Sequence, residues 1–279
     1  MKRKPAMLLC AAALLSILLI LETNCLVVTR FEYKSPKLPA EFDGFKIVQI
    51  SDLHNKSFGE NQEQLLGKIR ELSPDIIVVT GDLIDRRFMN LGAAMRFVRG
   101  AVSIAPVYYV TGNHEAWSGK YGEIKRELTG AGVHMADDNV ITLIRNGSAI
   151  KILGLSDPAF LTAEHENRTD TSKLERSIAE LSDGSLFQVL LSHRPELIDI
   201  YAAHGIDLVF SGHAHGGQIR LPFIGALFAP GQGLFPKYSK GMYTLGGTTM
   251  IVSGGLGGSV PVRTFNKPEI VAVTLSRAE

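Results

Sequence analysis

Four short motifs in the chain carry side chains that bind metal ions, and a single histidine, His193, adds a fifth element. The motifs are Asp52-Leu53-His54, Gly81-Asp82, Gly112-Asn113-His114-Glu115 and Gly212-His213-Ala214-His215. Two imidazoles one residue apart and bracketed by glycines have little reason to lie in a core, and they can point together at one ion. Asp52-Leu53-His54 or Gly81-Asp82 alone would be an ordinary turn. Together the motifs predict a metal site.

The candidate ligands are too many for one ion. They are Asp52, His54, Asp82, Asn113, His193, His213 and His215. Two divalent ions that share one bridging carboxylate would use them all. Two ions about 3.5–4 Å apart clamp phosphoryl oxygens and lower the pKa of a bound water, which provides a hydroxide near neutral pH. The set therefore predicts hydrolysis of a phosphate ester.

The ligand types indicate which metals would bind. Both cysteines, Cys10 and Cys25, lie in the N-terminal region, so no thiolate is available to the rest of the chain. Nitrogen and carboxylate ligands without thiolate favour two divalent ions from the group Mn, Fe and Zn.

Each motif follows a run of residues typical of a buried strand. These runs are 46–50, 76–79, 107–110, 187–191 and 207–210. Helix-like stretches lie between several of them, at 61–72, 91–102, 121–130 and 172–181. Alternating strands and helices indicate largely parallel strands, and ligands of such sheets gather at the carboxyl ends of the strands. The five elements should therefore meet at one rim.

Other segments predict antiparallel pairing. The runs 140–145 and 149–155 flank Asn146-Gly147, the strongest short signal of a hairpin. Two further strands, 250–253 and 270–275, close the chain. The predicted fold class is α/β, a mixed two-sheet α/β/β/α sandwich.

The N-terminus predicts a membrane anchor. Lys2, Arg3 and Lys4 precede an apolar run over 5–21, and residues 26–28 extend it to roughly the 20 residues that a transmembrane helix needs. No small-x-small cleavage site follows, which favours an uncleaved anchor over a removed signal peptide. The predicted division is a signal anchor at 1–28, an extended tether at 29–44 and a catalytic domain at 45–279, on the extracytoplasmic side.

Composition limits the class of partner. The chain has 279 residues, 45% of them hydrophobic, which fits one large domain with an appendage. Lys and Arg number 29 against 28 acidic residues, and no basic and aromatic strip is present, so no nucleic acid is expected. The oligomeric state is left open. Three histidines outside the motifs, His134, His165 and His204, are interpreted as ordinary surface or core residues.

In their order and over about residues 45–276, the motifs resemble those of the calcineurin-like metallophosphoesterases. The resemblance implies a first metal held by Asp52, His54 and His215, and a second held by Asn113, His193 and His213. It implies that Asp82 bridges the two metals.

The resemblance also implies roles beside the metals. His114 matches the residue that contacts phosphate and protonates the leaving group, a step that an imidazole can perform. The alternative is that His114 only caps a helix or supports a ligand. Asp85 and Glu115 either support the ligands through hydrogen bonds or lie on the surface.

A finer resemblance is to a bacterial branch with an N-terminal signal or anchor, which includes UDP-diacylglucosamine pyrophosphatases. It is carried by residues 45–54, by 217–222 running on to Lys240-Gly241, and by 254–265 followed by 268–270. It implies a phosphodiesterase or pyrophosphatase that acts on envelope or lipid-linked substrates. One departure concerns substrate binding: residues 253–258 are rich in glycine where relatives place a charged residue.

Two features leave alternatives open. The apolar loop 221–238 is either a packed surface loop or a hydrophobic lip that receives acyl chains or touches a membrane. A phosphomonoesterase or protein phosphatase would use the same metal core. A metal-binding scaffold without activity is a third hypothesis, against which the complete ligand set with His114 argues.

Overall fold

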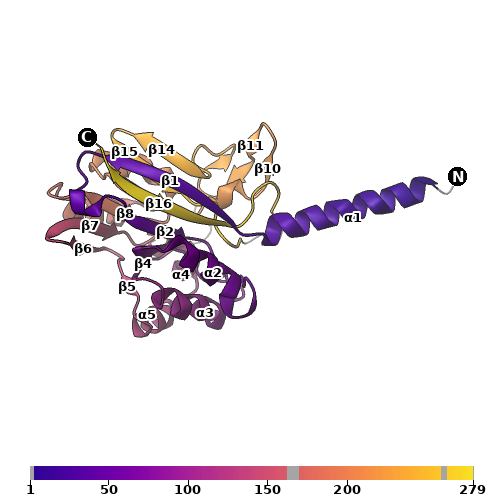
Figure 1. The fold of residues 1–279 in the computed structure, drawn as a ribbon, viewed down its shortest axis with the longest axis horizontal. Coiled ribbons are helices and arrows are strands. Elements are labelled where there is room, and N and C mark those ends of the chain that lie inside the picture. The colour runs from indigo at the N-terminus through magenta and orange to yellow at the C-terminus, as the bar shows by residue number, and fades with distance from the viewer. Residues whose placement is uncertain (1–2, 162–169, 259–262, 279) are drawn as a thin grey trace.

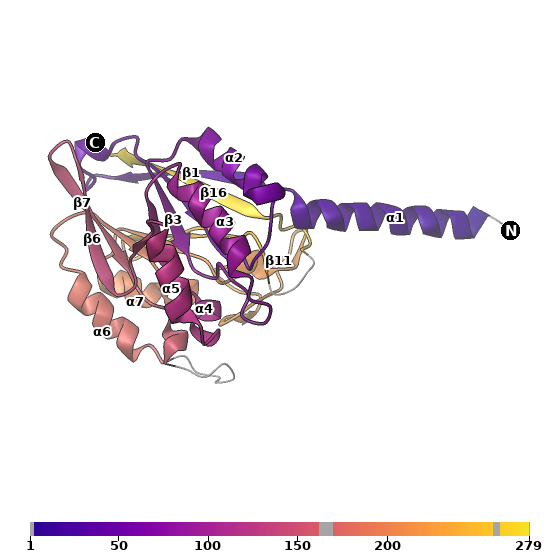
Figure 2. The ribbon, with the colours of Figure 1, turned by 90° about the horizontal axis from the view of Figure 1, so that it is seen from below.

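Two six-stranded sheets face each other, and helices cover their outer sides (Figures 1 and 2). The computed structural model describes residues 3–161, 170–258 and 263–278, and side chains from Ala13 onward except that of Leu15. The strand orders are β1-β16-β2-β3-β4-β5 in the first sheet and β14-β15-β9-β8-β7-β6 in the second. The mixed two-sheet α/β fold predicted from the sequence is confirmed.

The central strands of both sheets run parallel. In the first sheet the strands are β1 (Val27–Ser35), β16 (Glu269–Arg277), β2 (Lys46–Ile50), β3 (Ile76–Thr80), β4 (Val107–Val110) and β5 (His134–Met135). In the second they are β14 (Gly241–Leu245), β15 (Thr248–Val252), β9 (Leu208–Ser211), β8 (Gln188–Leu191), β7 (Ser148–Gly154) and β6 (Asn139–Arg145). β2 to β5 are mutually parallel, as are β15, β9, β8 and β7. Their carboxyl ends therefore form common edges on which polar side chains can collect.

Seven α-helices and several short elements complete the described chain. The helices are α1 (Arg3–Asn24), α2 (Glu63–Leu72), α3 (Leu91–Val102), α4 (Asn113–Trp117), α5 (Tyr121–Gly130), α6 (Ser172–Leu181) and α7 (Ile198–Ala203). The 3-10 turns are η1 (Ala40–Phe42), η2 (Glu60–Gln62), η3 (Pro158–Phe160), η4 (Pro195–Leu197) and η5 (His215–Gly217). Two small hairpins pair β10 (Arg220–Leu221) with β11 (Gly225–Ala226), and β12 (Phe228–Ala229) with β13 (Gly233–Leu234).

Three apolar clusters hold the layers together. The cluster between the sheets includes Ile47, Val78 and Phe210, which are fully buried. A second cluster packs α2, α3 and α5 on the first sheet, and a third packs α6 and α7 on the second. Each fully buried aliphatic or aromatic side chain contributes about 1.5–3 kcal/mol of transfer free energy. The rigid sandwich can therefore hold its strand ends in fixed positions.

The predicted hairpin around Asn146-Gly147 is present. Its strands β6 and β7 pair antiparallel from Asn139 opposite Gly154 to Arg145 opposite Ser148. Asn146 and Gly147 both have positive φ, 49° and 88°. This is the backbone that a tight two-residue hairpin turn requires, and Asn-Gly adopts it most readily.

The N-terminal region differs from its prediction. Residues 29–44 are no free tether: Val27–Ser35 form β1, which pairs in parallel with β16 along its whole length. Phe42 in η1 is also buried. The expected anchor at 1–28 is shorter as a helix, since α1 ends at Asn24 and the valines that were counted in the anchor begin β1. Among the described residues, no helix has both the length and the apolarity needed to cross a bilayer.

Candidate metal centre

The seven predicted ligands come together where five strands end. Two of them follow β2, one follows β3, one follows β4, one follows β8 and two follow β9. In that order they are Asp52 and His54, Asp82, Asn113, His193, and His213 and His215. All seven side chains are buried. Three strands come from the first sheet and two from the second, so the site joins the two sheets at one rim.

Five of the ligands have a left-handed backbone that side chains seldom adopt. Their φ values are 53° for Asp52, 46° for His54, 54° for Asp82, 64° for His213 and 49° for His215. Such a conformation costs of order 1–3 kcal/mol per residue and persists where the surrounding structure enforces it. Asp and His tolerate it better than most residues. The chain thus uses sharp turns directly after its strands to aim these side chains inward.

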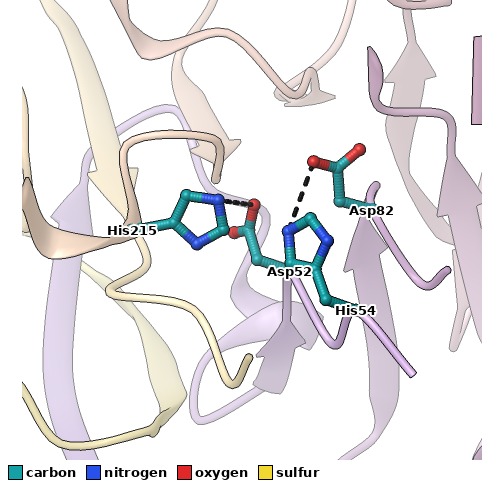
Figure 3. A group of neighbouring side chains, drawn as sticks. All are labelled: Asp52, His54, Asp82 and His215. Carbon is teal, nitrogen blue, oxygen red and sulfur yellow. Dashed lines mark ion pairs between the residues drawn. The ribbon is translucent and has the colours of Figure 1, made fainter. Parts of the chain in front are cut away.

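The first group of ligands consists of Asp52, His54, Asp82 and His215 (Figure 3). Nε2 of His54 lies 3.5 Å from Oδ2 of Asp82, and Nε2 of His215 lies 3.7 Å from Oδ1 of Asp52. One ligand atom from each of the four side chains lies within 4.8 Å of the other three. The four side chains point toward one another from three different strand ends and could surround one ion.

The second group shares Asp82 with the first. Nε2 of His193 lies 3.3 Å from Oδ2 of Asp82, 3.2 Å from Oδ1 of Asn113 and 3.2 Å from Nδ1 of His213. Ligands bonded to one cation at about 2.0–2.2 Å are separated from each other by roughly 3.0–3.5 Å in tetrahedral or octahedral geometry. These donor atoms already have that spacing.

Several buried polar atoms of the site lack a hydrogen-bond partner, and their positions fit two cations. Oδ2 of Asp52, Oδ2 of Asp82, both ring nitrogens of His54 and Nδ1 of His215 are buried and accept or donate no hydrogen bond. A buried carboxylate oxygen without a partner is costly. Oδ1 of Asp82 accepts the backbone N–H of His114 at 2.8 Å, which leaves Oδ2 to face both groups. The residues therefore fit two ions with Asp82 between them.

Electrostatics in the site also suit cations. Burial opposes a charged imidazole at His193, but the carboxylates of Asp82 and Asp52 outweigh burial and raise its pKa to about 10. The same negative field would attract a metal ion. Burial lowers the pKa of His54 and of His213, so that both rings are neutral and their nitrogen lone pairs can bind metal.

Neighbouring groups fix the orientation of the ligands. Nδ1 of His193 donates to the carbonyl of Thr80 at 2.7 Å, which leaves Nε2 to face the second group. The buried carboxylate of Glu115 accepts the backbone N–H groups of Asp82 and Gly112, both at 2.8 Å. Burial raises the pKa of Glu115 to about 7. Of the two roles left open for Glu115, the structure favours support of the ligands.

Glycines in two motifs permit the close approach of the loops. A Cβ atom at Gly112 would lie 2.2 Å from Oδ1 of Asp82. A Cβ atom at Gly212 would lie 1.9 Å from Oγ of Ser51 and 2.6 Å from Oδ2 of Asp52. Any larger residue at these positions would displace a candidate ligand, which explains why the motifs contain glycine there.

His114 lies beside the first group. Its ring centroid is 4.4 Å from that of His54, and Oδ2 of Asp85 lies 3.9 Å from Nδ1 of each histidine. The backbone N–H of Arg86 donates to Nδ1 of His114 at 3.2 Å. His114 is therefore placed beside the ligands, where a proton donor would lie, and Asp85 lies beside both rings rather than on the surface.

Sequence reasoning missed a buried ion pair at the second group. Nε and Nη2 of Arg194 donate to the two carboxylate oxygens of Asp157 at 2.7 and 2.9 Å, and Nη1 lies 2.9 Å from Nε2 of His213. Asp157 raises the pKa of Arg194 although burial opposes it. The signal was available, because Asp157 follows the end of β7 as the ligands follow their strands, and Arg194 is next to His193.

A second missed residue is Arg263, which is only 3% exposed. Its guanidinium donates to the carbonyls of Gly254, Gly255 and His215. The glycine-rich segment 253–258 was expected to lack a charged group, and Arg263 supplies one from further along the chain. Burial lowers the pKa of Arg263 to about 10. Lys56 is also near, and burial together with the charge of Arg263 lowers its pKa to about 8.

His134 and His204, the described histidines outside the motifs, take no part in the site. His134 stacks on Tyr108 with ring centroids 4.9 Å apart, and Nδ1 of His204 donates to the carbonyl of Ile200. His165 lies outside the residues that the structure describes.

Comparisons with known proteins agree with this arrangement. The model of the calcineurin-like phosphoesterase family matches residues 45–217. The chain is 35% identical to the uncharacterized metallophosphoesterase YkuE of Bacillus subtilis (strain 168), covering 91% of this chain and 87% of YkuE. It is 26% identical to the UDP-2,3-diacylglucosamine pyrophosphatase LpxG of Chlamydia muridarum, covering 90% of this chain and 89% of LpxG. In fold it resembles the protein TT1561 of Thermus thermophilus, with a TM-score of 0.53 and 15% identity over 76% of this chain and 89% of that one.

The fold and the site define a metal-dependent hydrolase of phosphoester bonds. The chain belongs to the calcineurin-like phosphoesterase family. A pair of divalent cations held by these ligands would withdraw charge from phosphoryl oxygens and make a water molecule more acidic. The protein supplies the rigid strand ends, the shared carboxylate of Asp82 and the adjacent imidazole of His114.

Proposed function

We propose that the protein is a phosphodiesterase or pyrophosphatase that acts on lipid-linked substrates of the cell envelope. The observation that carries this proposal is an apolar surface that begins beside the metal centre. It consists of Leu221, Phe223, Ile224, Phe228, Leu234, Phe235 and Phe265, all exposed, and is called the apolar lip below. Exposed apolar side chains gathered in this way mark a surface that binds a partner or a lipid.

The apolar lip is built directly onto the site. Strand β10 starts three residues after η5, whose first residue is the candidate ligand His215. Nη1 of Arg220 donates to the carbonyl of Gly216 at 2.9 Å, and the backbone N–H of Arg220 donates to the carbonyl of Thr264. In both ribbon views β11 lies on the side from which α1 leaves the sandwich (Figures 1 and 2). Acyl chains on the lip would place a linked phosphate near the metal ligands.

The relatives support the same class of substrate. LpxG is by name a UDP-2,3-diacylglucosamine pyrophosphatase, whose substrate carries acyl chains and a pyrophosphate, and this chain covers 89% of its length. Of the two roles left open for loop 221–238, its exposed phenylalanines support the hydrophobic lip over the packed surface loop.

The test is a comparison of substrates on the full chain loaded with Mn²⁺. We expect hydrolysis of bis(p-nitrophenyl) phosphate to exceed that of p-nitrophenyl phosphate. We also expect kcat/KM for UDP-diacylglucosamine in detergent micelles to exceed that for UDP-N-acetylglucosamine by 10-fold or more, since a few buried methylene groups at about 0.8 kcal/mol each suffice for that ratio. Removal of the metal with a chelator should abolish all of these rates, and Mn²⁺ should restore them.

Other outcomes would assign a different function. A clear preference for the monoester or for a phosphopeptide would favour the phosphomonoesterase or protein phosphatase alternative. Full metal content without hydrolysis of any ester would indicate a scaffold. Equal rates for the acylated and the soluble substrate would reject the lipid-linked part of the proposal alone.

We also propose that the catalytic domain lies at the extracytoplasmic face of a membrane. The support is the sequence pattern at the N-terminus, where Lys2, Arg3 and Lys4 precede the apolar run. In intact spheroplasts of cells that produce the protein, added protease should digest residues 45–279 without lysis. Protection of the domain until the cells are lysed would contradict this placement.

A further inference from the structure

A cavity of about 340 Å³ adjoins the first group of candidate ligands. His54 lines it on one side, and Lys56 and Arg263 contribute two positive charges to its wall. The end of α1 closes another side through Thr23 and Asn24. Its size falls within the range of small-molecule sites, about 300–1,000 Å³. The described residues that line it include no carboxylate.

Neither positive group of this cavity forms an ion pair with a described side chain, and the carboxylates of Asp52 and Glu269 attract Arg263 only from a greater distance. Among the described residues, no carboxylate lies within ion-pair distance of either Lys56 or Arg263. Arg263 donates to three backbone carbonyls, and Nζ of Lys56 donates to the carbonyl of Thr23. Carbonyls satisfy the hydrogen bonds but carry no net charge. A half-buried lysine beside a buried arginine therefore leaves a positive potential in the cavity, which favours an anion.

The position of the cavity relates it to the substrate. It shares His54 with the metal centre, and the backbone N–H of Gly257 in its wall donates to the carbonyl of Asp52 at 2.6 Å. Arg263, which also lines the cavity, is two residues from Phe265 of the apolar lip. When the reacting phosphorus of a molecule lies at the metals, a neighbouring group of that molecule would thus reach the cavity. The apolar part of the same molecule would reach the apolar lip.

We propose that the cavity binds the second phosphate of a pyrophosphate diester. This inference rests on the proposed function and narrows it from phosphodiesters in general to substrates with a P–O–P linkage. In the reaction, an oxygen from water forms a bond to one phosphorus and the bond from that phosphorus to the bridging oxygen breaks. The second phosphate leaves with the bridging oxygen as a monoester. Lys56 and Arg263 stabilise the negative charge that this phosphate gains.

A purely structural role for Lys56 gives a different expectation. Its bond to the Thr23 carbonyl could serve only to cap α1 at its C-terminus. Loss of a cap would lower the rate on every substrate by a similar factor. Loss of a phosphate contact would lower the rate selectively for substrates that have the second phosphate.

The experiment compares two diesters on the full Mn²⁺-loaded chain. UDP-glucose contains a pyrophosphate, and bis(p-nitrophenyl) phosphate contains a single phosphorus. Lys56→Gln should lower the ratio of kcat/KM for UDP-glucose to that for bis(p-nitrophenyl) phosphate about 10-fold, mainly through KM. Lys56→Arg should restore most of the ratio because it keeps the charge. Lys125→Gln, at an exposed lysine on α5, is the matched control and should leave the ratio unchanged.

The outcomes separate this inference from the proposed function. No hydrolysis of any diester by the wild-type protein would reject the proposed function itself. Hydrolysis of bis(p-nitrophenyl) phosphate without hydrolysis of UDP-glucose, or an equal loss on both substrates in Lys56→Gln, would overturn the pyrophosphate subsite while leaving the phosphodiesterase in place. Arg263→Lys, which keeps the charge but loses carbonyl contacts, should change the ratio less than Lys56→Gln does.

Discussion

Asp82→Asn is expected to lower metal content and activity together. The amide has the shape of the carboxylate, and its oxygen can still accept the N–H of His114 that now binds Oδ1 at 2.8 Å. It lacks the negative charge that both ligand groups face. Even residues that only support metal ligands cost 10–100-fold in affinity or activity when replaced. We therefore expect a loss of at least about 100-fold in kcat/KM for bis(p-nitrophenyl) phosphate.

The number of metal ions bound per chain is measured by elemental mass spectrometry, on the same samples that are used for the kinetics. Asp183→Asn is the matched control, because Asp183 is an exposed aspartate that pairs with Lys151 on the surface. The control should retain two ions and its rate. An Asp82→Asn protein that holds two ions and turns over normally would show that Asp82 does not bridge the metals.

The meeting of the candidate ligands at one rim could be predicted because their chemistry and their position both leave a local pattern. Asp52, His54 and His215 are polar residues placed directly after apolar strands, and the parallel arrangement of those strands follows from the helices between them. Three of these helices could also be predicted from the sequence, because the predicted ranges 91–102, 121–130 and 172–181 coincide with α3, α5 and α6. In each, the apolar period is helical and one face packs on a sheet.

Strand β1 could not be predicted in the same way, because its partner is far along the chain. Val27 pairs with the region of Glu269, so the pairing spans most of the sequence. Strand preference depends on such neighbours more than on the residues themselves. Pro36 and Pro39 lie just beyond the strand, where a proline cannot donate a backbone N–H to a neighbouring strand.

The cavity lined by Lys56 and Arg263 could not be predicted from the sequence for another reason. Arg263 donates to three backbone carbonyls. Because every residue has a backbone carbonyl, no pattern of side chains in the sequence predicts this contact. The segment 253–258 was therefore interpreted as lacking a charge that the fold supplies from Arg263. Asp157, unlike Arg263, could have been predicted. It is a polar residue that closely follows the end of strand β7, as the candidate ligands follow their strands.

His114→Ala is expected to keep both metals and slow the reaction. The backbone N–H of His114 that orients Asp82 remains in the variant, so the ligand set should be undisturbed. The side chain removed is the one whose Nδ1 accepts the N–H of Arg86 and whose ring lies beside that of His54. Loss of a general acid costs typically 10²–10⁴-fold, and we expect kcat to fall within that range for poor leaving groups.

The leaving group decides between an acid and a supporting role. Across a series of aryl phosphodiesters, the loss in His114→Ala should grow as the pKa of the leaving phenol rises, because a more basic oxygen needs the proton more. A pyrophosphate substrate expels a phosphate monoester whose charge Lys56 and Arg263 can stabilise. The loss of rate in His114→Ala should therefore be among the smallest for this substrate. His134→Ala, at a histidine that stacks on Tyr108 away from the site, is the control. A loss in His114→Ala that is the same for every leaving group would exclude proton donation and leave His114 as a residue that only positions its neighbours.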